Sequence, residues 1–310
     1  MSGFTITAGV SFSGGFTFTE APVENTAAWF GGGAYGARST VDRITYATDT
    51  ATASVRGPLS LARYGLAAAG NTTDGWFGGG SPIQSTVDRI TYATDTATAS
   101  VRGPLSSSRY FLAAAGNTTD GWFGGGLPGP LSTVNRVTYA TDTATASVRG
   151  PLSSARYGLG AAGNTTDGWF GGGRPGVIST VDRITYATDT ATASVRGPLS
   201  AAIRYLAAAG NTTDGWFGGG LPGPVSTVQR ITYATDTATA SVRGPLSVAT
   251  RQLAAAGNTT DGWFGGGDVG FPSVSSTVQR ITYATDTATA SVRGPLSLAR
   301  NLLAAAGGIQ

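Results

Sequence analysis

The sequence contains no histidine, no cysteine and no lysine, so all 20 of its basic residues are arginine. Without histidine or cysteine the chain has no thiolate nucleophile, no histidine-containing catalytic triad and no ordinary zinc site. We therefore predict no metal site and no cofactor. Disulfides are excluded as well, so packing alone must hold the fold.

Long apolar runs and clusters of basic residues are also missing. No apolar run approaches the roughly 20 residues of a membrane-spanning helix, and residues 1–20 lack the basic residue of a secretion signal. We expect neither a signal peptide nor membrane insertion. The net charge of +3 comes from arginines at repeated positions, which argues against a nucleic-acid partner.

The sequence does contain a repeat. The motif Trp-Phe-Gly-Gly-Gly starts at six positions 46 or 47 residues apart: Trp29, Trp76, Trp122, Trp169, Trp216 and Trp263. Within one period, residues 63–70, 75–79, 86–93 and 98–105 are each the size of a strand, and turn-forming residues separate them. Four antiparallel strands per repeat are typical of a propeller blade. The sequence therefore predicts an all-β, six-bladed β-propeller over residues 27–310.

The two ends of the repeat region complement each other. The region starts with a second strand at residues 29–33 and finishes with a first strand at residues 300–308. We expect the C-terminal first strand to lie beside the N-terminal second strand. It would then complete one blade with the N-terminal second, third and fourth strands, because closure covers both free strand edges.

The order of residues in each repeat resembles the kelch family. The matching elements are Arg63, Ala67–Ala69, Phe77-Gly78-Gly79, Tyr92 and residues 94–98. One departure is that kelch repeats commonly carry a tryptophan in the fourth strand, where this chain has Ala53. We interpret the six second-strand tryptophans as structural core residues that fill the volume left by alanine-rich strands.

Differences between the copies gather in two segments, which are the loop between the second and third strands and the entry to the first strand. Both connections emerge at the same end of an up-and-down sheet. Since function on a rigid scaffold concentrates in loops, we predict that this face binds a ligand. The alternative is drift in loops that tolerate change.

An arginine opens each first strand, and the kelch resemblance implies that it bonds to backbone carbonyls. The other interpretation is a ring of guanidiniums around the channel mouth that favours anionic groups. Arg204 and Arg251 sit one residue later than the other four, which should turn their side chains the other way. The candidate ligand-binding residues are Arg63, Tyr64, Arg109, Tyr110, Phe111, Arg156, Tyr157, Arg204, Tyr205, Arg251, Arg300, Tyr35, Arg38, Arg174 and Phe271.

Catalysis is disfavoured by the repetition itself. Six-bladed propellers include sialidases, which use arginines with a tyrosine–glutamate pair, but the only glutamates here are Glu20 and Glu24, before the propeller. Asp74 and Asp49, with their copies, are interpreted as turn residues. A catalytic site needs different groups held in one asymmetric place. We therefore predict that the protein is not an enzyme and assign no catalytic residue.

Residues 1–26 differ from the repeats, because apolar and polar residues alternate around Ser13-Gly14-Gly15 as in a hairpin. We predict that these residues form an arm that docks on another chain of an assembly, where it would anchor the propeller, or on the flank of the propeller itself. Near-identical blades with such an arm resemble repeat proteins of marine phage virions, which implies a tail or surface component recognising a host-surface glycan or protein. The alternative is an engineered or recently amplified scaffold with no natural ligand.

Overall fold

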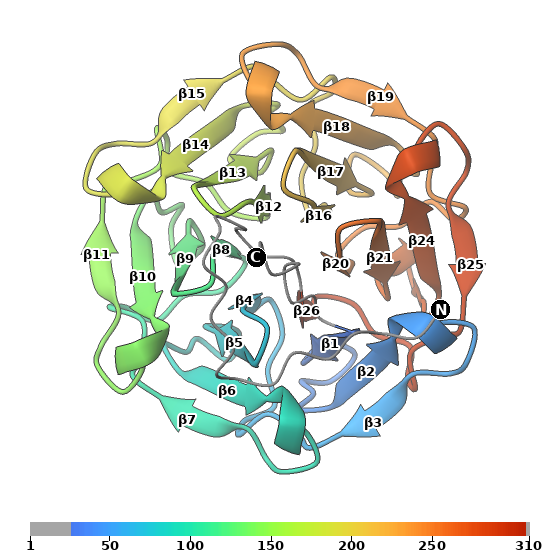
Figure 1. Cartoon of the computed structure of the whole chain (residues 1–310), viewed down its shortest axis with the longest axis horizontal. Helices are drawn as coiled ribbons and strands as arrows, with labels where there is room; N and C mark the ends of the chain where they lie inside the picture. Colours follow the sequence, from blue (N-terminus) through green and yellow to red (C-terminus); the bar gives the residue numbers. More distant parts are fainter. Residues whose placement is uncertain (1–25, 308–310) are drawn as a thin grey trace, which may run out of the picture.

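The computed structural model describes residues 26–307, which form six four-stranded antiparallel sheets arranged in a ring (Figure 1). The six-bladed β-propeller predicted from the repeat is confirmed. The predicted arm lies almost wholly in residues 1–25, outside the described residues. No helix of the described chain is long and apolar enough to cross a bilayer.

The sheets are numbered as blades I to VI along the chain. Blade I comprises β26 (Ala304–Ala306), β1 (Ala27–Gly31), β2 (Val41–Thr45) and β3 (Ser54–Arg56). Blade II comprises β4 (Ala67–Gly70), β5 (Asp74–Gly78), β6 (Val87–Thr91) and β7 (Ser100–Arg102). Blade III comprises β8 (Ala113–Gly116), β9 (Asp120–Gly124), β10 (Val134–Thr138) and β11 (Ser147–Arg149).

The other three blades repeat this order. Blade IV comprises β12 (Gly160–Gly163), β13 (Asp167–Gly171), β14 (Val181–Thr185) and β15 (Ser194–Arg196). Blade V comprises β16 (Ala207–Gly210), β17 (Asp214–Gly218), β18 (Val228–Thr232) and β19 (Ser241–Arg243). Blade VI comprises β20 (Ala254–Gly257), β21 (Asp261–Gly265), β24 (Val278–Thr282) and β25 (Ser291–Arg293), and its longest loop holds the hairpin β22 (Asp268–Gly270) and β23 (Ser273–Val274).

Blade I contains both ends of the described chain. β26 pairs antiparallel with β1, in a register that sets Trp29 opposite Ala306 and Gly31 opposite Ala304. The last strand of the chain therefore supplies the innermost strand of the first blade.

The Trp-Phe pair of each second strand is buried on both sides of its sheet. Trp76 is 1% exposed and packs in the cluster between blades II and III, whereas its neighbour Phe77 is fully buried in the cluster between blades I and II. Adjacent strand residues point to opposite faces, so each blade buries one ring against each neighbouring blade. Ala67 and Ala69 lie in the Trp76 cluster, as expected if the indole fills the space beside small residues.

A polar contact accompanies this packing at every blade interface. The Trp76 indole stacks on Tyr139 of blade III at a centroid distance of 3.7 Å, and its Nε1 donates to Asp142 Oδ2 at 2.9 Å. Arg89 Nη1 donates to the same carboxylate oxygen at 3.1 Å. One aspartate of the next blade thus satisfies a buried indole N–H and a guanidinium.

The interface that closes the ring has the same chemistry as the other five. Trp263 of blade VI stacks on Tyr46 of blade I at 3.9 Å and donates to Asp49 Oδ2 at 2.8 Å. Arg280 Nη1 donates to the same oxygen at 3.1 Å. Asp49 and its copies are therefore interblade acceptors, a role beyond the turn residue predicted from sequence.

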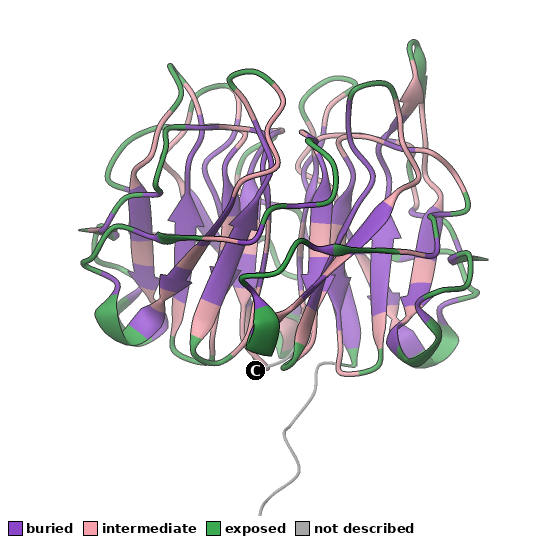
Figure 2. Cartoon of the chain, turned by 90° about the horizontal axis from the view of Figure 1, so that it is seen from above, coloured by how far each residue is buried: buried purple, intermediate pink, exposed green. Residues whose placement is uncertain are grey.

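The propeller has two different faces (Figure 2). The turn face carries the Asn-Thr-Thr-Asp turns and six short 3-10 helices, η1 (Tyr46–Thr48), η2 (Tyr92–Thr94), η3 (Tyr139–Thr141), η4 (Tyr186–Thr188), η5 (Tyr233–Thr235) and η6 (Tyr283–Thr285). The loop face carries the connections between second and third strands and the entries to the innermost strands. These two variable segments are paired by isolated β-bridges, such as Tyr64 with Ser81 and Tyr157 with Arg174. The structure thus brings the two variable segments of each blade together on one face.

Candidate functional site

Four of the six first-strand arginines predicted to bind a ligand are buried inside the blades. Arg63, Arg109, Arg156 and Arg300 are 0% exposed. Arg63 Nη2 donates to the Phe77 carbonyl at 2.9 Å and to Asp88 Oδ2 at 3.0 Å. The predicted ring of six guanidiniums at the channel mouth is therefore wrong. These side chains turn into the sheet, where a carboxylate or amide and strand carbonyls satisfy them.

Blade III differs from the others that bury an arginine, because its acceptor is an amide. Arg109 Nη2 donates to Asn135 Oδ1 at 3.1 Å, where blade II has the carboxylate of Asp88. Burial lowers the pKa of Arg109 from its ordinary value to about 10. In blades II and IV the opposite charge of Asp88 or Asp182 acts against the effect of burial on the pKa of the arginine.

Blades V and VI have no arginine at this buried position. Ile203 and Thr250 occupy it, and the third-strand aspartate is replaced by Gln229 and Gln279. Gln229 Oε1 accepts from Ser200 Oγ at 2.7 Å and from the Ala201 N–H at 3.1 Å. Both members of the pair change together, since a buried carboxylate without its arginine would be costly.

The same change moves two arginines onto the loop face. Arg204 and Arg251, which follow Ile203 and Thr250, are partly buried rather than enclosed. Arg251 Nη2 pairs with Asp268 Oδ2 at 2.8 Å. The one-residue shift predicted to reverse these side chains therefore has its expected effect, and Arg204 keeps no carboxylate within 4.0 Å among the described residues.

A ring of backbone hydrogen bonds surrounds the channel mouth on the loop face. One residue per blade has a left-handed backbone, and its N–H donates to the carbonyl of the equivalent residue in the preceding blade at 2.6–2.8 Å. We call this closed circuit the mouth ring. Its members are Gly65, Phe111, Gly158, Tyr205, Gln252 and Leu302.

Four mouth-ring members are not glycine, although their φ angles lie between 55° and 59°. For a residue with a Cβ this conformation costs about 1–2 kcal/mol. Their side chains are partly exposed, and the Phe111 ring lies so close to Gly65 that a Cβ there would be 2.7 Å from it. Strain at such positions is commonly retained where the side chain has a role.

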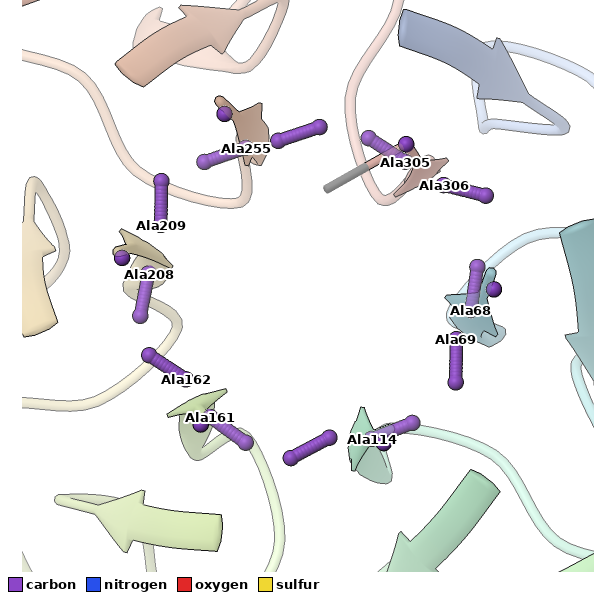
Figure 3. A pocket seen from close by; sticks show the side chains of 18 residues that line it. Ala68, Ala69, Ala114, Ala161, Ala162, Ala208, Ala209, Ala255, Ala305 and Ala306 are labelled. Carbon is purple, nitrogen blue, oxygen red and sulfur yellow. The ribbon is translucent and has the colours of Figure 1, made fainter. Parts of the chain in front are cut away.

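The channel below the mouth ring offers no chemistry of its own. Six leucines, each 5% exposed, line its upper part, and alanines and glycines of the innermost strands line its lower part. The lower part forms a cavity of about 100 Å³, and methyl groups are the only side-chain atoms that line it (Figure 3). Among the described residues, no group of three or more acidic side chains could hold a metal ion.

Aromatic side chains from blades III to V form a cluster beside the mouth ring. Phe111 lies 5.4 Å from Tyr205 and 6.4 Å from Tyr157, and Tyr157 lies 6.4 Å from Tyr205, measured between ring centroids. Tyr110 contacts Phe111 at 4.7 Å. Arg174 lies over the Tyr157 ring at 5.7 Å. We call Tyr110, Phe111, Tyr157, Arg174 and Tyr205 the aromatic cluster. All five are among the ligand-binding candidates predicted from the sequence.

The remaining candidates lie elsewhere on the loop face. Tyr35 is 60% exposed and its hydroxyl donates to the Pro272 carbonyl at 3.0 Å, while the neighbouring Phe271 is 90% exposed. Arg38 Nη2 donates to the Tyr35 carbonyl at 3.2 Å. Tyr64 is partly buried in blade II. Tyr35, Arg38 and Phe271 thus belong to the junction of blades VI and I, away from the aromatic cluster.

Comparison with known proteins supports the architecture. No protein-family model matches the sequence, and no curated protein matches it. Among solved structures, the chain is similar to the protein described as "Structure of YjhT", with a TM-score of 0.67 and 11% identity over 80% of this chain and 88% of the other. This similarity shows the fold alone. The kelch resemblance has no support beyond the six-bladed propeller.

Proposed function

We propose that this propeller is a non-catalytic recognition protein that binds a glycan through its loop face. The observation that carries the proposal is the aromatic cluster, in which Phe111 and Tyr205 hold a strained backbone while their rings stay partly exposed. Aromatic rings present a flat apolar surface that suits the apolar face of a sugar, and tyrosine with arginine is a frequent combination at binding surfaces.

The residues of the loop face favour binding over catalysis. Asp268 is the only carboxylate in the two variable segments of all six blades, and it is paired with Arg251. Most glycoside hydrolases need two carboxyl groups that flank the scissile bond, and the variable segments offer one. Sialidases instead use a tyrosine nucleophile with a glutamate, and the variable segments contain no glutamate.

The test replaces strained aromatic residues by glycine, the residue that Gly65 and Gly158 already provide in other blades. Phe111→Gly and Tyr205→Gly remove the ring and relieve about 1–2 kcal/mol of backbone strain. Both variants should melt close to the wild-type temperature and lose binding on a glycan array and to host cells. Leu302→Gly is the matched control, because it relieves the same strain outside the aromatic cluster and should retain binding.

Two results would contradict the proposal. Binding that survives in both aromatic variants would remove the loop-face cluster from recognition. A wild-type protein that binds no glycan and no cell would favour the alternative of an amplified or engineered scaffold without a natural ligand.

We further propose that the protein is a surface component of a phage virion, with residues 1–26 as the attachment to other virion proteins. This proposal rests on the resemblance of the near-identical repeats to repeat proteins of marine phage virions. Mass spectrometry of purified virions is the direct test: the full chain should be present, and a chain lacking residues 1–26 should be lost from the particles. Absence of the full chain from virions would refute this role.

A further inference from the structure

Arginines of this protein are nearly all neutralised, which makes the exceptions informative. Sixteen of the 20 arginines lie within 4.0 Å of a carboxylate oxygen. Among the described residues, the four without such a partner are Arg38, Arg109, Arg174 and Arg204. Arg109 is fully buried. Three uncompensated guanidiniums therefore remain on the loop face.

Two of these three converge on one side chain. Arg174, from the loop of blade IV, lies over the Tyr157 ring, whose centroid is 6.4 Å from that of Tyr205, and Arg204 is the residue directly before Tyr205. Burial raises the pKa of Tyr205, while both arginines act in the opposite direction, as cations close to the hydroxyl must. Two positive charges thus meet at the interface of blades IV and V.

The site is held in place from both blades. Arg174 pairs through its backbone with Tyr157 and lies over that ring at 5.7 Å. Tyr205 is fixed by the mouth ring through its N–H to the Gly158 carbonyl at 2.6 Å. Arg204 is anchored by a backbone bridge to Leu221. The groups are therefore positioned before any ligand arrives, which lowers the entropic cost of binding.

We propose that Arg174, Arg204, Tyr205 and Tyr157 form a site for the anionic group of an acidic saccharide, a sugar bearing a carboxylate. The guanidiniums provide forked N–H donors that match a carboxylate, and the tyrosine rings provide the surface for the sugar ring. A cationic ligand is disfavoured, because Arg174 already covers the Tyr157 ring and no described carboxylate lies within 4.0 Å of Arg174 or Arg204. This inference rests on the proposed function and specifies its ligand class.

The arrangement of the blades explains why this site occurs once. It needs an arginine in the loop of one blade and an arginine displaced to the surface in the next. Blade IV provides Arg174, and blade V provides Arg204 because Ile203 has taken the buried position. The other displaced arginine, Arg251, is neutralised by Asp268.

The experiment measures binding of polygalacturonate oligomers, with fully methyl-esterified oligomers as the neutral comparison, by calorimetry at low and high salt. The wild type should bind the acidic oligomers, and its affinity for the methyl ester should be at least about tenfold lower. Added salt should weaken binding of the acidic oligomers. Arg174→Ala and Arg204→Ala should each weaken acid binding about tenfold or more. Arg174→Lys should recover only part of it, because lysine lacks the fork.

Arg38→Ala is the matched control. Arg38 is also on the loop face without a described carboxylate partner, but it lies beside Tyr35 rather than in the cluster. Its removal should change binding less than about twofold. An equal effect of Arg38→Ala would show that net charge attracts the polymer and would overturn the site, as would equal binding of the methyl ester.

The outcomes separate this inference from the proposed function. If the array glycans that bind through Phe111 and Tyr205 are neutral, and if Arg174→Ala does not change their binding, the acidic-sugar site is wrong and glycan recognition stands. If polygalacturonate binds through Arg174 while no array glycan or host cell does, the anion site stands and the biological role is wrong.

Discussion

Replacing Asn135 by aspartate should stabilise the protein, because Arg109 is the one buried arginine that has no carboxylate. Burial lowers its pKa to about 10, well below that of a free arginine, so burial disfavours the charged guanidinium at neutral pH. A shift of this size corresponds to about 3 kcal/mol, and hydrogen bonds to a charged group contribute about 1.5–3 kcal/mol. We expect Asn135→Asp to raise the free energy of unfolding by about 1–3 kcal/mol.

The structure offers a template for the new carboxylate. In blade II, Asp88 accepts from Arg63 at 3.0 Å, from Ser60 Oγ at 2.6 Å and from the Ser60 N–H at 3.1 Å. Blade III has the equivalent serine, whose N–H already donates to Asn135 Oδ1 at 3.0 Å. The introduced aspartate would therefore find every partner that Asp88 has.

Denaturant unfolding of Asn135→Asp, with the reverse change Asp88→Asn as the control, tests this reasoning. The first variant should unfold at higher denaturant concentration and the second at lower. In the wild type the native state binds fewer protons than the unfolded chain from about pH 10 up to the pKa of a free arginine, so the cost at Arg109 is present below pH 10 and declines above it. The gain from Asn135→Asp should accordingly be constant from about pH 6 to 9. A variant that is no more stable than the wild type would refute the account.

Two further predictions concern groups buried in the blades. Gln229→Asp places a carboxylate beside Ile203 without an arginine and should lower the free energy of unfolding by about 3 kcal/mol or more. Adding Ile203→Arg to the same chain should restore most of that loss. Equal stability of the single and double variants in thermal unfolding would contradict this reasoning. Burial raises the pKa of five interblade tyrosines, so their contribution to stability is present below about pH 10 and is lost as the pH rises further. Unfolding and the absorbance of tyrosinate should therefore appear together in an alkaline titration. Ionisation of these tyrosines without unfolding would refute the effect. These tyrosines are Tyr92, Tyr139, Tyr186, Tyr233 and Tyr283.

The fold could be predicted because the repeat carries the information locally. The Trp-Phe-Gly-Gly-Gly motif marks every second strand, and turn residues mark the ends of the strands. The role of Asp49 and its copies could not be predicted in this way. Trp29 bonds to a carboxylate 66 residues further along the chain, and every repeat has the same residues, so no difference between copies reveals the pair.

The buried arginines are different, because the copies did contain a signal. The third-strand residue is glutamine in the two repeats whose arginine is displaced, and aspartate or asparagine in the four whose arginine is not. Comparing the third strands together with the first strands would have paired Arg63 with Asp88 and placed Arg63 inside the blade. The convergence of Phe111, Tyr157 and Tyr205 could not be derived from one repeat, since it depends on the mouth ring that joins three blades.

The contact of Trp263 with Tyr46 and Asp49 has a consequence for how the chain can be cut and rejoined. Because the closing interface repeats the other five, the ring has no weak seam, and its covalent start and finish are arbitrary with respect to packing. Moving the termini from blade I to any other blade would leave each blade with the same neighbours. Such a circular permutant would present the loop face unchanged while starting the chain at a chosen blade.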